Sequence, residues 1–202
     1  EAARALAAEA GMGAVQIAAV AARAGIAAGT VYRYFPSKTA LVAAVVAIVS
    51  ERELAAIRRA GDAAPGPLSA LAAAITTVAA RALGRRRLAW AVIAEPVDPA
   101  IDAVRLVHRK ALAAEIATRL AAAIRAGHLP EQDVRVAAPA LVGALLEGLV
   151  GPLAPDASTN AGAARDAVQT LTLLALRAVG IVDAHARGLV VQTVVPAPGD
   201  AA

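Results

Sequence analysis

The stretch AARAGIAAGTVYRYFPSK, residues 21–38, decides how this chain folds. The sequence contains one Trp, two Tyr and one Phe, and both tyrosines and the phenylalanine lie in this stretch. Arg33 and Lys38 stand among them, and no Asp or Glu occurs between Ala10 and Ser50. Since 59% of the residues are hydrophobic and many of these are alanine, such a cluster of aromatic and basic side chains indicates a surface suited to a polyanion.

Two short helices joined by a one-glycine corner are expected here. Residues 17–24 form the first helix and residues 28–35 the second, which ends at Pro36. Gly25 stands where the corner requires a positive φ. These are the dimensions of a helix-turn-helix, although the spacing also fits an ordinary helical hairpin. The small core of the motif is expected to contain Ile17, Val20, Ala21, Ile26 and Val31.

The outward face of the second helix is the candidate DNA-reading surface. With Val31 buried, the polar side chains of this helix point the other way. Hydroxyl groups can bond to phosphates or base edges, aromatic rings can contact thymine methyls, and arginine can bond bidentately to guanine. The candidate contacts are Thr30, Tyr32, Arg33 and Tyr34.

Two neighbouring residues extend this surface toward the DNA backbone. Gly29, at the start of the second helix, allows the main chain to approach DNA closely. Lys38, at the start of the next helix, can bind a phosphate together with the local N–H groups. A helical scaffold or interaction protein without sequence-specific DNA binding is the alternative function, but it gives no reason for the Tyr/Arg face.

At these residues the sequence resembles a known family. The run AARAGIAAGTVYRYFPSKTALVAAVV is similar to the N-terminal motif of TetR-type transcriptional repressors, A-x-x-A-G-V-S-x-G-T-(L/V)-Y-x-(Y/H)-F-x-(S/N)-K-x-x-L. The resemblance covers about residues 1–50, and it implies a two-domain, all-helical protein that binds a double-stranded DNA operator. The matching positions are Ala21, Ala24, Gly25, Ile26, Gly29, Thr30, Val31, Tyr32, Tyr34, Phe35, Ser37, Lys38 and Leu41.

Three positions depart from the family pattern. Ala27 replaces a serine that usually caps the recognition helix, which removes about 1 kcal/mol of capping. Ala28 replaces a residue that is often a polar DNA contact. Gln16 stands where Ser or Thr commonly touches a phosphate, and its amide can still donate such a bond. Gln16 and Ala28 therefore stay among the candidate DNA-binding positions, and fewer phosphate contacts predict weaker binding with a shallower salt dependence.

Helical periodicity, interrupted by Gly and Pro, continues through the rest of the chain. The pattern predicts an all-α fold of about nine helices. We divide the chain into a helix-turn-helix domain at residues 1–50 with a truncated N-terminus, a C-terminal effector-binding and dimerisation domain at residues 51–182, and a tail at residues 183–202. The helices are expected at residues 1–10, 17–24, 28–35, 38–59, 68–83, 87–95, 99–126, 131–151 and 161–180.

The resemblance implies that the C-terminal domain forms a homodimer. The helices at 131–151 and 161–180 each carry an apolar stripe, and two such helices from each subunit would form a four-helix interface. The alternative is that both helices serve only their own core. The candidate interface residues are Leu141, Leu145, Leu149, Val168, Leu171 and Ala175.

The resemblance also implies a small-molecule effector. Polar or aromatic residues within otherwise apolar helices could project into its pocket. The candidates are Trp90, Arg105, His108 and Glu147, each of which also has a plain explanation in the core or at the surface. A mostly aliphatic pocket would favour a hydrophobic molecule.

Enzyme chemistry finds no support in the sequence. No HExxH, GxSxG or phosphate-binding loop occurs, and the absence of cysteine excludes disulfides and thiolate metal sites. We therefore expect no catalytic residues, no metal and no cofactor.

The longest uncharged run, residues 63–80, is too short and too weakly apolar to span a membrane. The absence of cysteine fits a reducing cytosol, and the resemblance implies a cytoplasmic bacterial protein that meets the nucleoid through DNA.

Overall fold

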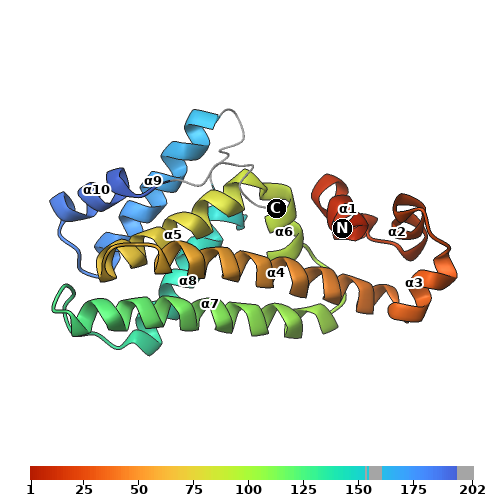
Figure 1. The fold of residues 1–202 in the computed structure, drawn as a ribbon, viewed down its shortest axis with the longest axis horizontal. Helices are drawn as coiled ribbons and strands as arrows, with labels where there is room; N and C mark the ends of the chain where they lie inside the picture. The colour runs from red at the N-terminus through yellow and green to blue at the C-terminus, as the bar shows by residue number, and fades with distance from the viewer. Residues whose placement is uncertain (153, 155–160, 195–202) are drawn as a thin grey trace. The chain divides into compact units, whose positions relative to one another are not determined.

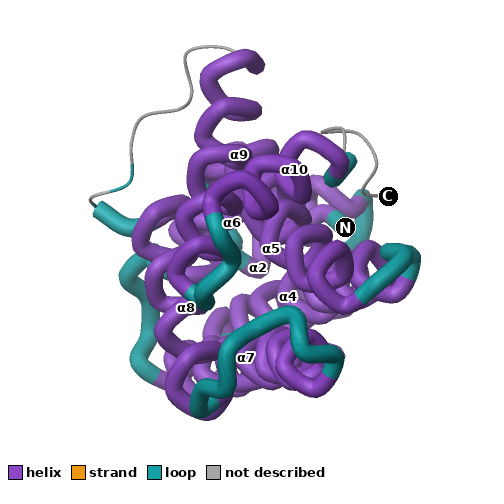
Figure 2. The backbone as a smooth tube through the Cα atoms, turned by 90° about the vertical axis from the view of Figure 1, so that its left-hand side faces the viewer, coloured by secondary structure: helices purple, strands orange, loops and turns teal. Residues whose placement is uncertain are grey.

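The computed structural model describes residues 1–152, 154 and 161–194. These residues form ten α-helices and a 3-10 turn, η1 (Met12–Ala14), and no strand occurs in this part of the chain (Figures 1 and 2). The all-α prediction is confirmed. The helices are α1 (Ala2–Ala10), α2 (Ile17–Ala24), α3 (Ala28–Tyr34), α4 (Lys38–Asp62), α5 (Pro67–Gly84), α6 (Arg86–Ile93), α7 (Ala100–Arg125), α8 (Val134–Val150), α9 (Ala161–Ala178) and α10 (Asp183–Gln192).

The chain divides into two compact units. Unit 1 comprises residues 1–52 and 85–108, and unit 2 comprises residues 53–84 together with the described residues from 109 onward. The first break lies close to the boundary that the sequence indicates. However, residues 85–108 pack with the N-terminal helices, whereas the sequence-based division assigned them to the C-terminal domain.

Unit 1 is built around small aliphatic side chains. Helix α6 packs against α1, and α2 packs against α3. The α4 residues of this core recur at helical spacing, so that one face of the helix is apolar and buried. The buried core residues on α2, α4 and α6 are Ile17, Val20, Ala21, Leu41, Val42, Val45, Val46, Val49, Leu88, Ala91 and Val92.

Helix α5 is the central helix of unit 2. It packs against α8, α9 and α10 and is apolar on nearly every side. Its 18 residues have a mean hydropathy of 1.3, enough by length and composition to cross a membrane, but 56% of them are buried inside the protein, as in the core helix of a soluble domain. The hydroxyls of Thr76 and Thr172 lie 3.3 Å apart and join α5 to α9 in this core.

Helix α10 differs from the sequence-based expectation of a tail without helical periodicity. Ala186, Leu189 and Val190 are buried at the i, i+3, i+4 spacing of a helix, and α10 packs on α9 and α5. Burial of this short apolar stripe explains why the segment is helical. The remainder of the predicted tail, residues 195–202, lies outside the described residues, as does most of the loop expected between α8 and α9.

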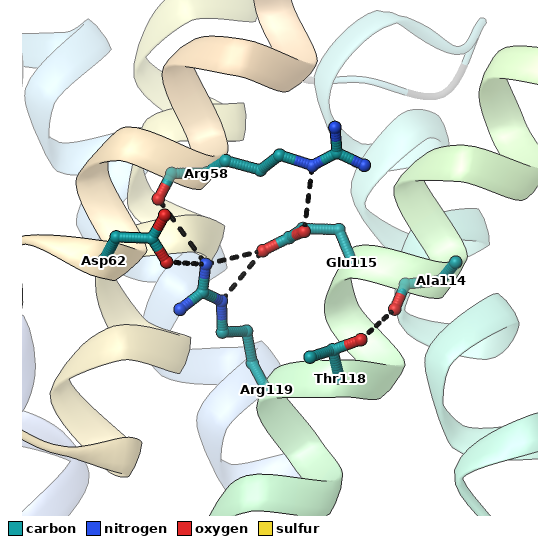
Figure 3. A network of polar contacts seen from close by, with 6 residues as sticks. All are labelled: Arg58, Asp62, Ala114, Glu115, Thr118 and Arg119. Carbon is teal, nitrogen blue, oxygen red and sulfur yellow. Dashed lines mark hydrogen bonds and ion pairs between the residues drawn. The ribbon is translucent and has the colours of Figure 1, made fainter.

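A polar network joins α4 and α7 within unit 2 (Figure 3). The Arg119 guanidinium donates to Glu115 at 2.8 Å and to Asp62 at 2.6 Å, and Arg58 donates to Glu115 at 3.2 Å. Burial alone would lower the pKa of Arg119, but the hydrogen bonds to Asp62 and Glu115 outweigh burial and raise it. A Cβ at Gly61 would lie 2.8 Å from the Arg119 guanidinium carbon, so the guanidinium packs closely against the backbone of Gly61, where a side chain would not fit.

Candidate nucleic-acid interface

The corner between α2 and α3 confirms the expected helix-turn-helix geometry. Gly25 has a left-handed φ of 67°, and the N–H of Ile26 returns to the carbonyl of Ala21 at 3.0 Å. Ala21 and Val31 are buried in the unit 1 core. The prediction that Ile26 completes this core is wrong: Ile26 is 47% exposed because it belongs to the turn rather than to either helix.

The polar side chains of α3 lie on its outer surface, as the sequence predicts. Tyr32 and Tyr34 are 55% and 68% exposed, although large aromatic side chains are usually buried. The guanidinium of Arg33 lies 5.3 Å from the centre of the Tyr34 ring, within cation–π range. Thr30 is half-buried at the start of the helix. This face presents hydroxyl, aromatic and guanidinium groups to the surroundings.

The residues that flank α3 leave room for a close partner. A Cβ at Gly29 would meet no atom within 4 Å, so packing inside the protein does not require this glycine. Ser37 accepts a hydrogen bond from the Ala40 N–H at 3.1 Å and caps α4, as expected. Lys38, the first residue of α4, is exposed. Its charge and the N-terminus of α4 together form an environment that favours a phosphate.

The departures from the family pattern have visible consequences. Ala27 has the extended backbone of an N-cap residue, but no side chain caps α3. Ala28 is exposed at the first position of the helix. Gln16 is exposed before α2, and its side-chain amide donates to the Gly13 carbonyl at 2.9 Å. A phosphate contact from Gln16 would therefore use its second N–H or replace this bond.

Three basic residues lie between Ala10 and Ser50, and one of them, Arg23, pairs with an acid. Its guanidinium donates to both oxygens of Glu9, at 2.5 Å each. These hydrogen bonds lower the pKa of Glu9. Arg33 and Lys38 are thus the two basic residues of this acid-free stretch that pair with no carboxylate among the residues that the structure describes.

The sequence did not indicate three polar residues that contact or support the helix-turn-helix. Glu95 accepts hydrogen bonds from the N–H groups of η1, and Asp98 accepts one from Thr39. Arg105 is 9% exposed and donates to backbone carbonyls at the end of α6. These contacts join residues that are far apart along the chain, so local sequence patterns carry no signal for them.

Comparisons with known proteins agree with this geometry. Residues 1–45 match the family model described as bacterial regulatory proteins, tetR family. A search of curated protein sequences finds no significant match. Among solved structures, RolR in complex with resorcinol is similar with a TM-score of 0.71 and 24% identity, covering 98% of this chain and 93% of RolR.

Two further structures extend the likeness. FadR from Bacillus subtilis in complex with stearoyl-CoA has a TM-score of 0.69 and 20% identity, with 85% of this chain and 94% of FadR covered. A TetR-like transcriptional regulator from Rhodococcus sp. has a TM-score of 0.61 and 25% identity, with 88% and 91% covered. The N-terminal domain, residues 1–45, is that of a TetR-family DNA-binding transcriptional regulator, and the chain as a whole shares the fold of the TetR-like regulator. Regulators of this family are not enzymes.

The four residues predicted to contact an effector divide between the two units of the regulator. Trp90, Arg105 and His108 belong to unit 1, and Glu147 belongs to unit 2. Trp90 and His108 are half-buried, whereas Glu147 is exposed and its carboxyl folds back over Gly151. Arg105 differs from the expectation because its donors hold the regulator's own backbone. An effector-binding role for the other three stays a prediction.

Most of the predicted dimer residues are buried within the chain. This burial favours the alternative, that the stripe serves its own core, and a part of these residues in a dimer interface stays a prediction. A Leu171 methyl carbon would lie 2.8 Å from a Cβ at Gly148, which shows how closely α8 and α9 pack. Leu141, Leu145, Leu149, Val168 and Ala175 are buried, and Leu171 is half-buried.

Proposed function

We propose that the regulator is a ligand-responsive repressor that binds a palindromic operator as a homodimer and is released by a small hydrophobic effector. The observation that carries the DNA-binding part is the outer face of α3. Two exposed tyrosines and an exposed arginine follow a tight helix-turn-helix corner, and nothing in unit 1 covers them among the described residues. This combination suits the major groove, where such side chains read base edges and thymine methyls.

A homodimer follows from the recognition of palindromic DNA. A two-fold protein presents its recognition helices about 34–36 Å apart, one turn of the duplex, so that both enter the major groove on one side. The outward faces of α8 and α9 supply a surface for this dimer. Val136, Ala140, Gly143 and Ala144 recur at helical spacing on the exposed side of α8, and Leu174 is exposed on α9. Small residues allow helices to approach closely.

A small-molecule effector would lower operator affinity by favouring a second arrangement of the dimer. Binding in the C-terminal domain would change the separation of the two recognition helices, with α4 as the lever, because α4 begins directly after α3. RolR is in complex with resorcinol and FadR with stearoyl-CoA, and these two ligands differ widely in size. They support a small-molecule effector as the class of ligand but do not indicate which compound this regulator binds. The aliphatic surroundings of α5 favour a hydrophobic one. We place the regulator in the cytoplasm.

The decisive experiment is selection of bound DNA from a random pool with the intact protein. We expect a palindromic consensus. Tyr32→Ala and Lys38→Ala should abolish binding to that operator while sedimentation shows the same oligomer as wild type. Lys110→Ala, which removes a charge from an exposed position on α7, is the matched control and should bind normally. Operator footprints retained by both the Tyr32 and Lys38 variants would refute the assignment.

Trp90 offers a separate test of the effector site. It is the chain's single tryptophan and is half-buried on α6. A compound that releases operator DNA should change Trp90 fluorescence if this residue borders the pocket. A releasing compound that leaves the emission spectrum unchanged would remove Trp90 from the effector site but would not affect the DNA-binding assignment.

A further inference from the structure

The loop after α6 contacts the protein just ahead of α2. The Glu95 carboxylate accepts the Met12 N–H at 2.9 Å and the Gly13 N–H at 3.2 Å. These N–H groups open η1, and donors at the start of a helical turn have no partner within it. Gly11 has a φ of 82°, and a Cβ there would lie 2.7 Å from a Glu95 oxygen. The carboxylate therefore fits against a backbone that only glycine permits.

The same loop contacts the protein again just after α3. One oxygen of Asp98 accepts the Thr39 hydroxyl at 3.0 Å, and the other accepts the Ala100 N–H at 2.9 Å. Thr39 is the second residue of α4 and is adjacent to Lys38. Asp98 therefore caps the start of α7 and holds the start of α4 at the same time.

The loop is itself held in place by a buried guanidinium. Arg105 donates to the carbonyl oxygens of Ala91 at 3.1 Å, Val92 at 2.8 Å and Glu95 at 2.8 Å. The Glu95 N–H in turn donates to the Trp90 carbonyl at 2.9 Å. Since the backbone of Glu95 is bonded through both its N–H and its carbonyl, its carboxylate projects from a fixed point of unit 1.

We propose that Glu95 and Asp98 are positioning residues for DNA binding. They form a clamp, defined by these two side chains, that holds residues 12–13 before α2 and Thr39 after α3, and so sets the orientation of the reading face between them. The proposal rests on the proposed function, because orientation matters only if α3 reads DNA. All the contacts of the clamp lie within unit 1.

Electrostatics and geometry predict opposite effects when the clamp is removed. Both residues are acids in a unit that binds a polyanion, so loss of either negative charge should strengthen DNA binding if charge alone matters. If the clamp orients α3, the same change should weaken operator binding. The sign of the effect thus separates the two explanations.

The test compares Glu95→Gln, Asp98→Asn and the double variant with wild type, on the selected operator and on non-specific DNA at one salt concentration. The amide replaces one accepting oxygen with an NH2 group, which cannot accept an N–H bond. We expect about tenfold weaker operator binding for each single variant, within the usual range of coupling between sites, and unchanged or tighter non-specific binding. Glu51→Gln is the matched control, since Glu51 is exposed and has no hydrogen bond or ion pair among the described residues.

A second readout distinguishes orientation from simple loss of stability. Wild type should discriminate against operators whose half-site spacing differs by one base pair, and the clamp variants should discriminate less. A variant that is only less stable would lose active protein but keep the spacing preference. Gly11→Ala disturbs the fit of Glu95 while keeping both charges, and it should show the same relaxed spacing. Circular dichroism at the assay temperature confirms that each variant is folded.

Operator affinities of folded Glu95→Gln and Asp98→Asn that equal or exceed wild type would overturn the clamp. If wild type selects no palindromic operator, the proposed function is refuted. Amide exchange then tests the clamp without DNA. At least one of the Met12 and Gly13 amides should exchange about tenfold faster or more in Glu95→Gln, because these two N–H groups bond to different carboxylate oxygens and the amide side chain keeps only one of them. Unchanged exchange at both amides would refute the clamp independently of any DNA result.

Discussion

Ala27 leaves the start of the recognition helix without a side-chain cap. Its backbone, with φ of −67° and ψ of 142°, already has the conformation in which a serine side chain would accept an N–H from the first turn of α3. Ala27→Ser should therefore raise the free energy of unfolding by about 0.5–1 kcal/mol, as measured by urea denaturation. Ala22→Ser, exposed within α2, is the control and should be neutral or destabilising. Equal effects at the two positions would contradict a capping explanation.

The ion pair between Glu9 and Arg23 makes the stability of unit 1 depend on pH. The hydrogen bonds from Arg23 lower the pKa of Glu9 below its ordinary value of 4.5. The contribution is therefore complete above that value and is lost as the pH falls through the lower, folded-state pKa. We expect thermal unfolding midpoints of Glu9→Gln to lie below wild type at neutral pH and to converge with it in acid. Glu51→Gln should follow wild type throughout, and parallel curves for Glu9→Gln would contradict the pairing.

Residues whose roles depend on local conformation could be predicted from the sequence. Gly25, Val31 and Ser37 act within a turn or two of their own positions, so spacing was sufficient to assign them. Glu95 and Arg105 could not be predicted in this way, because their partners are set by how the helices pack rather than by neighbouring residues.

At the scale of the element, helices α8 and α9 show why periodicity alone does not tell which face of a helix is buried and which is exposed. Both are rich in Ala, Leu and Val on more than one side, so the apolar pattern predicts a helix without showing which face is the core. The structure assigns the Leu141 and Leu145 stripe to the interior and leaves Val136 and Leu174 exposed. For α10, the sequence pattern did not predict a helix, because the apolar stripe of this segment is only three residues long.

The exposed face of α9 carries a prediction about assembly. Leu174→Glu would place a charge in the proposed interface twice, once from each subunit, and should weaken the dimer by at least about 2 kcal/mol, roughly 30-fold in the dissociation constant. Sedimentation at several protein concentrations measures this change. Val191→Glu adds the same charge at an exposed position on α10 and should leave the dimer intact. A Leu174→Glu protein that sediments as wild type would place the interface elsewhere.

At the scale of the whole molecule, the regulator carries a net charge of only +4. On the reading side, Arg33 and Lys38 are the basic residues of the acid-free stretch that remain available, because Arg23 is paired with Glu9. Two such contacts per subunit neutralise about four phosphates in a dimer, which predicts a slope of about −3 to −4 for log K against log salt.

The salt dependence can be checked by titration at several salt concentrations. Lys38→Ala removes one contact per subunit and should reduce the slope by about two, if residual binding is measured on non-specific DNA. Lys110→Ala should leave it unchanged. A wild-type slope steeper than about −8 would show that basic residues outside this stretch also contact the DNA.

The recognition helix α3 is seven residues long and buries one side chain, Val31. Helices shorter than about 12 residues are marginal in water, so α3 takes its order from α2 and the unit 1 core. Segments with few buried contacts open locally at a low free-energy cost. DNA held against the exposed face would oppose that opening, and part of the binding free energy would go into closing the helix. Amide exchange across residues 30–34 and operator affinity are then two measurements of one linked equilibrium.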